Sequence, residues 1–242
     1  MCKIPFTRTQ PACRKLSSLP MTFIKSAFSG FFIAISTASL TLADVAPSWR
    51  GDPGSTLQRW DFTGNSTTPS PEVLTNPYGT PTLLVDYNPP FGEGYYGSSP
   101  APNMGVHTGI WDIANGSMSF GIPSVAVPAF YLQIQLQVTY WLDINQSPSF
   151  SLLPGAVQIG PTITTLVDDP AGSGAWYSDL IVWEVTPGPA SQAITLLGNA
   201  TFGSVIDQVI IDTKPVPEPT AFALGGIFAG LLFLRRRFVQ RA

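Results

Sequence analysis

The sequence predicts an all-β fold, a single antiparallel β-sandwich of jelly-roll type, and two observations carry this prediction. In the run Phe130–Trp141, apolar side chains at every even position from 132 to 140 alternate with three glutamines and a threonine. Period two is the repeat of a strand with one buried face and one face in water. No stretch between the two ends has the helical period that the crossovers of a parallel sheet need.

Turn-forming clusters of Pro, Gly, Asn and Asp divide the rest of the chain into short apolar runs. We expect further strands at Leu57–Phe62, Thr82–Tyr87, Gly109–Ile113, Ser117–Ile122, Ala156–Leu166, Trp176–Val185, Ala193–Leu197 and Val205–Thr213. The Pro-, Gly- and Ser-rich stretch from Asn65 to Asn103 is expected to be mostly surface loop. The segment 44–214 is long enough for one hydrophobic core and too short for two comfortable ones.

Residues 1–43 have the features of an N-terminal extension followed by a secretory signal peptide. Lys25 precedes an apolar run, and small residues lead up to Ala43. We expect signal peptidase to cut between Ala43 and Asp44, and Met21 to be the true start. An uncleaved N-terminal anchor is the alternative.

Residues 215–242 contain Pro217, Glu218 and Pro219, an uncharged apolar run over 221–234, and then Arg235, Arg236 and Arg237. A fourteen-residue helix is about 21 Å long, short of a hydrocarbon core of roughly 30 Å. The arginines would stay on the cytoplasmic side and leave the main domain outside. An ordinary C-terminal membrane anchor is the alternative.

This order of features resembles the PEP-CTERM sorting tail of Gram-negative bacteria, the signal that exosortase enzymes recognise. The resemblance covers only the end of the chain. It implies that Pro217, Glu218 and Pro219 are the recognition and processing element and that the arginine cluster sets orientation. It also implies that the apolar helix is a temporary hold in the inner membrane. By the same resemblance, the protein then moves to the cell surface or to an exopolysaccharide-containing matrix.

The segment 44–214 is strongly acidic. It holds Arg50, Arg59 and Lys214 against fourteen Asp and Glu residues, a net charge of -11. Such a surface repels phosphate backbones and argues against a nucleic-acid partner. Cys2 and Cys13 both precede the expected cleavage site, so the mature domain has no disulfide, no Cys-ligated zinc and no Cys nucleophile.

Catalytic chemistry has little support in the sequence, and we assign no catalytic residue. His107 is the single histidine, no Gly-x-Ser-x-Gly motif is present, and we expect the histidine to be structural or exposed to solvent. Glycoside hydrolysis needs two carboxylates on one face. Asp179 and Glu184 are an odd number of residues apart, as are Asp207 and Asp212, so each pair is expected to lie on opposite faces.

We expect no metal or other cofactor. Asp143-Ile144-Asn145 and Asp168-Asp169 offer oxygen ligands for calcium, but turn residues that make Asx hydrogen bonds explain them more simply.

Four aromatic residues in the loop-rich region suggest a sugar-binding surface: Tyr78, Phe91, Tyr95 and Tyr96. Exposed aromatic rings can stack on sugars, although packing within the fold is the commoner role. The leading hypothesis is a non-enzymatic surface or matrix protein. A carbohydrate-binding module that acts on exopolysaccharide is the alternative, and a secreted hydrolase is less favoured.

Overall fold

The computed structural model describes residues 44–87, 89, 94–99, 104–126, 130–142, 148–152, 155–170, 174–198 and 204–217. The predicted signal peptide, the membrane segment 221–234, the arginine cluster, Phe91 and two of the three sorting-motif residues lie outside this part. Within the described residues, no helix is long and apolar enough to cross a membrane.

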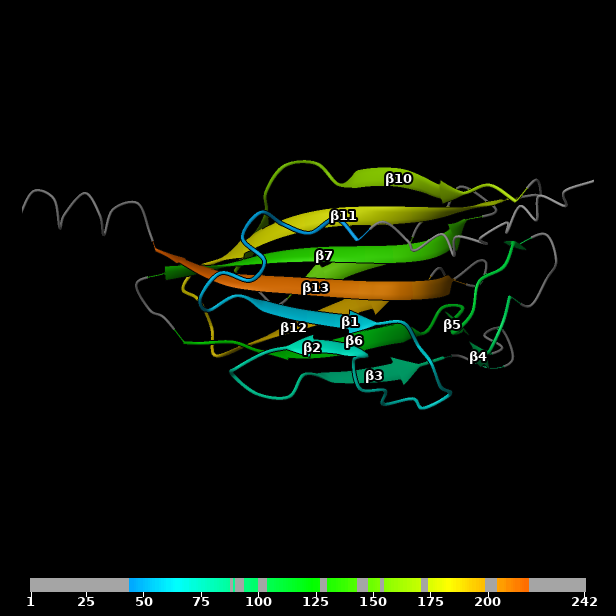
Figure 1. Cartoon of the computed structure of the whole chain (residues 1–242), viewed down its shortest axis with the longest axis horizontal. Coiled ribbons are helices and arrows are strands. Elements are labelled where there is room, and N and C mark those ends of the chain that lie inside the picture. The colour runs from blue at the N-terminus through cyan, green and yellow to red at the C-terminus, as the bar shows by residue number, and fades with distance from the viewer. Residues whose placement is uncertain are drawn as a thin grey trace, which may run out of the picture. The chain divides into compact units, whose positions relative to one another are not determined.

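The described chain is all-β, and its strands form two sheets that are paired antiparallel throughout (Figure 1). The larger sheet has the order β10-β11-β7-β13-β1-β2, with β4, β5 and β9 attached, and the smaller has the order β3-β6-β12-β8. The all-β prediction is confirmed, and the two sheets are consistent with a β-sandwich. The larger sheet comprises β1 (Thr56–Trp60), β2 (Val73–Thr75), β4 (Gly94–Tyr96), β5 (Ile110–Asp112), β7 (Phe130–Leu142), β9 (Ala156–Gln158), β10 (Ile163–Asp168), β11 (Ala175–Val185) and β13 (Val205–Pro217). The smaller comprises β3 (Thr82–Asp86), β6 (Ser117–Pro123), β8 (Ser149–Leu152) and β12 (Ser191–Leu197).

The core lies between the two sheets. The larger sheet contributes even-numbered residues of β7, such as Leu136 and Val138, and the smaller sheet contributes Phe120 and Ile194. Trp60 packs edge-to-face on Phe120 with ring centroids 5.1 Å apart. The alternation that predicted β7 is therefore the pattern that builds its inner face.

The outer face of β7 was predicted to be wet, and this prediction is wrong. Gln135 and Gln137 are buried because residues 44–55, here called the strap, lie across them. The Val45 N–H donates to Gln137 Oε1 at 2.9 Å, and Gln135 Nε2 donates to the Val45 carbonyl at 2.6 Å. Polar side chains tolerate burial here because each has a hydrogen-bond partner.

Ion pairs fasten the strap to β13. Arg50 donates two hydrogen bonds to Asp212, from Nε to Oδ1 at 2.7 Å and from Nη2 to Oδ2 at 2.6 Å. It also forms an ion pair with Asp44. Lys214 Nζ lies 2.6 Å from Asp52. Burial raises the pKa of the Asp212 carboxyl above its usual value, and the neighbouring guanidinium only partly offsets this.

Strand boundaries differ from the prediction where backbone details intervene. The expected strand Ala156–Leu166 is two strands, β9 and β10, because Gly160 has φ +75° and Pro161 cannot donate a hydrogen bond. Both pieces pair with β11. The strands β2 and β4 occur in the stretch expected to be mostly loop, and β8 was not predicted.

Candidate functional site

Two places in the described structure offer functional side chains. The first is a cluster at the β4–β5 end of the larger sheet, formed by His107, Asp168, Trp176 and Asp207 and here called the His107 cluster. The second is a groove on the outer face of the smaller sheet. We describe the cluster first because it contains the single histidine of the chain.

His107 lies between two carboxylates. Its Nδ1 is 3.0 Å from Asp207 Oδ2, and its Nε2 is 3.7 Å from Asp168 Oδ2. The ring stacks on Trp176 at a centroid distance of 4.0 Å and an interplanar angle of 23°. The His107 side chain is 12% exposed and that of Asp207 is 7% exposed, whereas that of Asp168 is 30% exposed. We predicted that His107 is either structural or exposed to solvent. Its ring is packed, which agrees with the first of these alternatives.

A β-bulge brings Asp207 to the histidine. The pairing of β13 with β7 shifts register between Ile206 and Gln208, so Asp207 is an extra residue with no partner in the ladder. A bulge re-aims side chains that a regular strand would alternate. We expected Asp207 and Asp212 on opposite faces because side chains alternate along a regular strand. The bulge at Asp207 interrupts this alternation, so the expectation does not apply.

Contacts with the surrounding loops hold His107 and its neighbours in place. Ser99 holds the backbone of His107 on both sides: its Oγ accepts from the His107 N–H at 3.0 Å, and its own N–H donates to the His107 carbonyl at 2.8 Å. Trp176 Nε1 donates to the Met104 carbonyl at 2.6 Å. Gly105 has φ +74°, which favours glycine, and a Cβ there would lie 2.9 Å from Asp168 Oδ2 and displace this carboxylate.

This geometry does not match that of a nucleophile-activating histidine. A carboxylate only accepts hydrogen bonds, so the His107 Nδ1–H donates to Asp207. The other ring nitrogen faces the Asp168 carboxylate rather than a hydroxyl, whereas a Ser-His-Asp relay requires a hydroxyl there.

The structure leaves the other predicted carboxylate pair on opposite faces. Asp179 lies opposite Val138 on the core side, and Glu184 lies opposite Gln133 on the other side. Asp179 accepts a hydrogen bond from Thr164 Oγ1 at 2.6 Å. Of the two calcium alternatives, Asp143-Ile144-Asn145 lies outside the described residues. Within the part that is described, no group of three or more His, Cys, Asp or Glu residues could hold a metal.

The predicted aromatic residues do not share one surface. Tyr78 is half-buried, and its hydroxyl donates to the Gly54 carbonyl at 3.2 Å, near Pro215. Tyr95 packs on Trp111 with centroids 5.7 Å apart, and Tyr96 packs against the cluster that contains Trp176. The Pro215 end and the β5 end are opposite ends of β13, so these tyrosines are packed at the two ends of the larger sheet.

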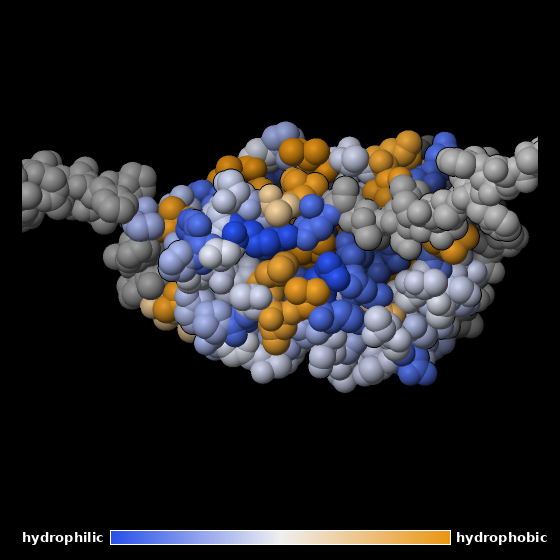
Figure 2. Space-filling view, in the orientation of Figure 1, coloured by the Kyte–Doolittle hydropathy of each residue, from blue (hydrophilic) through white to orange (hydrophobic). Residues whose placement is uncertain are grey.

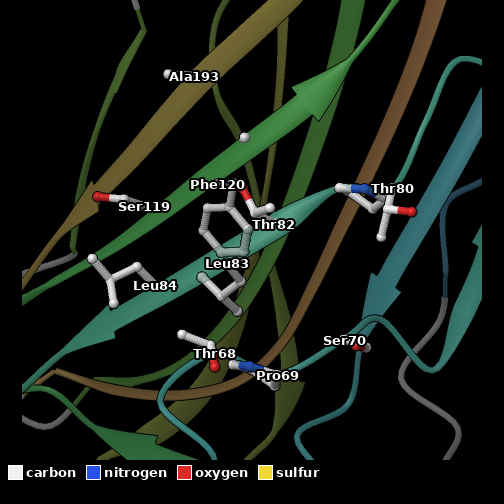
Figure 3. A pocket seen from close by; sticks show the side chains of 12 residues that line it. Thr68, Pro69, Ser70, Thr80, Thr82, Leu83, Leu84, Ser119, Phe120 and Ala193 are labelled. Carbon is white, nitrogen blue, oxygen red and sulfur yellow. The ribbon is translucent and has the colours of Figure 1, made fainter.

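The groove on the smaller sheet was not predicted, because its residues come from segments distant in the sequence. It has a volume of about 550 Å³ and lies over β3, β6 and β12, with residues 68–70 along one side (Figure 3). Its lining is rich in hydroxyls and contains no charged residue: Thr68, Pro69, Ser70, Thr80, Pro81, Thr82, Leu83, Leu84, Ser119, Phe120, Gly121 and Ala193. Leu84 is 54% exposed. A lining that carries no charge and combines hydroxyls with a larger apolar surface suits an uncharged ligand.

No protein-family model, curated protein or solved structure matches the chain.

Proposed function

We propose that the chain is an exported, non-enzymatic protein of the cell surface or extracellular matrix of a Gram-negative bacterium. In this proposal, a signal peptide delivers the sandwich across the inner membrane, and the PEP-CTERM tail holds and sorts it through an exosortase-like enzyme. The support is the tail motif in the sequence, together with the last described strand, β13, which leads directly into that motif.

The observation that carries the proposal is the attachment of the tail to β13. This strand lies inside the larger sheet, between β7 and β1, and it stays paired with β7 as far as Pro217, the first residue of the sorting motif. The predicted membrane segment begins at Ala221. Four residue steps span at most about 14 Å, so the tail would hold the sandwich directly at the membrane surface.

The strap supports the same proposal at the other terminus. Asp44, the expected first residue of the mature chain, binds Arg50, and Arg50 binds Asp212 on β13. Cleavage before Asp44 would leave this ion-paired unit whole. In this proposal, signal cleavage occurs just before the strap, and the sorting motif begins at the last residue of β13.

The double substitution Glu218→Ala and Pro219→Ala tests the sorting role. We expect the variant to be exported but to remain in the inner-membrane fraction at its unprocessed mass, as judged by fractionation and intact-mass spectrometry. Thr220→Ala, next to the motif, is the matched control and should be processed normally. Normal processing of the double variant would refute the recognition role of the motif.

A second candidate function is carbohydrate binding, and the groove is the observation that favours it. Its hydroxyls from Thr82 and Ser119 suit the hydrogen-bonding groups of a sugar, and the exposed Leu84 offers an apolar contact. The acidic exterior also suits a neutral glycan better than an anionic one.

A glycan array on the full chain, with and without calcium, tests this second candidate. We expect Ser119→Tyr, which fills the groove, to abolish any signal, and Ser151→Tyr, a serine substitution on β8 outside the groove lining, to leave it unchanged. No hit under either condition would remove the candidate.

A further inference from the structure

On one side of the sandwich, no other strand of the described residues pairs with the edges of the two sheets. The strand β10 ends the larger sheet, with β9 beside the same strand β11, and β8 ends the smaller sheet. Residues 148–152 and 155–168 form this side, here called the β8–β10 side. Only three residues, 153–155, lie between β8 and β9 in the sequence. An open strand edge offers backbone N–H and C=O groups that a further strand can pair with.

The opposite side of the sandwich is better covered. There the edge strand β3 receives a backbone contact from the preceding loop, since the Val85 N–H donates to the Thr67 carbonyl at 2.8 Å. The edge strand β2 is only three residues long and is flanked by Glu72, whose carboxylate accepts from the N–H groups of Asp61 and Thr63. A short edge, a charge and a covering loop are the usual protections of a sheet edge.

The β8–β10 side has no charged residue before Asp168, its last residue, so it lacks charge as a protecting feature along most of its length. No Asp, Glu, Lys, Arg or His occurs from Ile144 to Val167, whereas the segment 44–214 has a net charge of -11. Large apolar side chains are exposed along it, with exposed fractions of 61% at Val157, 56% at Ile163 and 54% at Leu166. Figure 2 shows hydrophobic groups along the upper edge of the view, where β10 lies.

We propose that the β8–β10 side is a self-association surface, on which β10 pairs antiparallel with β10 of a second copy of this chain. The unpaired backbone edge selects an extended polypeptide strand as the partner. The charge pattern selects a copy: two domains of charge -11 repel each other over most of their surfaces, and an uncharged side lets them meet without like charges in contact.

The register of β10 allows a two-fold pairing. In an antiparallel pair, residues directly opposite each other lie on the same face of the sheet. A two-fold pairing of two identical strands must therefore place one residue opposite the same residue of the other copy. Thr165 lies on the same face as its partner Ser178 and as Thr139 beyond it, which is the outer face. A two-fold axis between two Thr165 residues would extend the outer face across both sheets, with Thr opposite Thr, a favourable cross-strand pair.

Disulfide trapping tests the pairing in the full chain. With Cys2→Ser and Cys13→Ser in place, the chain has no other cysteine, so a disulfide can form only between copies. Cross-strand Cα distances of about 4.5–5.5 Å suit a disulfide. We expect Thr165→Cys, in membranes under mild oxidation, to shift from monomer to dimer mass on a non-reducing gel. Thr75→Cys, exposed on the opposite edge of the same sheet, is the matched control and should stay monomeric.

A second variant separates pairing from chance collision. Ile163→Lys, combined with Thr165→Cys, adds a charge on the same face two residues away and should abolish the dimer band. Far-ultraviolet circular dichroism of both variants should match the parent, because both positions are exposed. No dimer with Thr165→Cys, equal dimer with Thr75→Cys, or a dimer that survives Ile163→Lys would overturn the proposal. None of these outcomes depends on whether the tail is processed.

Discussion

Polar side chains are buried at two places on the larger sheet, under the strap and at Gln58, and the two places differ in hydrogen bonding. On the outer face, Gln135, Gln137 and Asp212 are buried under the strap, and each has a hydrogen bond or ion pair with it. On the inner face, Gln58 is fully buried opposite Ile211. Within the described residues, neither of its amide atoms has a hydrogen-bond partner.

This difference shows that burial alone does not decide what a polar side chain contributes to stability. A buried donor or acceptor without a partner costs about 1–3 kcal/mol, whereas a partnered one contributes about 1 kcal/mol. We therefore expect substitutions under the strap and at Gln58 to act in opposite directions. The expected effects below run from the largest to the smallest.

Removal of Arg50 should have the largest effect, because it leaves the Asp212 carboxylate buried with no counter-ion. We expect Arg50→Met to lower the free energy of unfolding by about 3 kcal/mol at pH 7, measured by urea denaturation. Arg59→Met is the matched control: its pair with Asp61 is partly exposed, and an exposed pair is worth less than about 1 kcal/mol.

The loss in Arg50→Met should depend on pH. Burial already raises the pKa of Asp212 in the folded state, and removal of Arg50 raises it further. The folded variant then binds a proton more tightly than the unfolded chain does, so its stability rises as the pH falls through that raised pKa. The deficit relative to the parent should be largest at neutral pH and smaller in acid. A deficit that is constant with pH would show that Arg50 acts through packing instead.

The His107 cluster supplies an intermediate effect at the bulge. His107→Ala leaves Asp207 nearly buried without its partner, and we expect a loss of about 2 kcal/mol. In a double-mutant cycle with Asp207→Ala, the combined loss should be smaller than the sum of the single losses. Additive losses would contradict the hydrogen bond between these two residues.

The smallest effect should be a gain. Gln58→Leu replaces an unpartnered amide by an apolar side chain of similar size, and we expect the free energy of unfolding to rise by about 1 kcal/mol. Gln137→Leu is the matched control on the outer face and should be destabilising, because the Val45 N–H loses its acceptor. A loss in both variants would mean that Gln58 and Gln137 do not differ in this way.

The sequence predicted the strands well because alternation is a local signal. The period-two run in Phe130–Trp141 became β7, and the runs near Trp176 and Val205 became β11 and β13. The same signal misjudged the outer face, because Gln135 and Gln137 look like surface residues until the strap covers them. The strap contacts span about ninety residues of sequence, which no local pattern reveals.

The candidate sites were harder to predict for the same physical reason. His107 and Asp207 are a hundred residues apart and meet only because a bulge adds one residue to β13. The groove joins residues 68–70 to three strands. The predicted signal cleavage site and sorting motif rest instead on local signatures, and the three motif residues are consecutive in the sequence.

The intact mass of the chain isolated from the cell envelope of its own host tests the central claim most directly. The proposed delivery by signal peptide and tail predicts a mature chain that begins at Asp44, in the inner membrane before processing and at the surface or in the matrix afterwards. A chain that retains the residues before Asp44, or that stays in the cytoplasm, would contradict it.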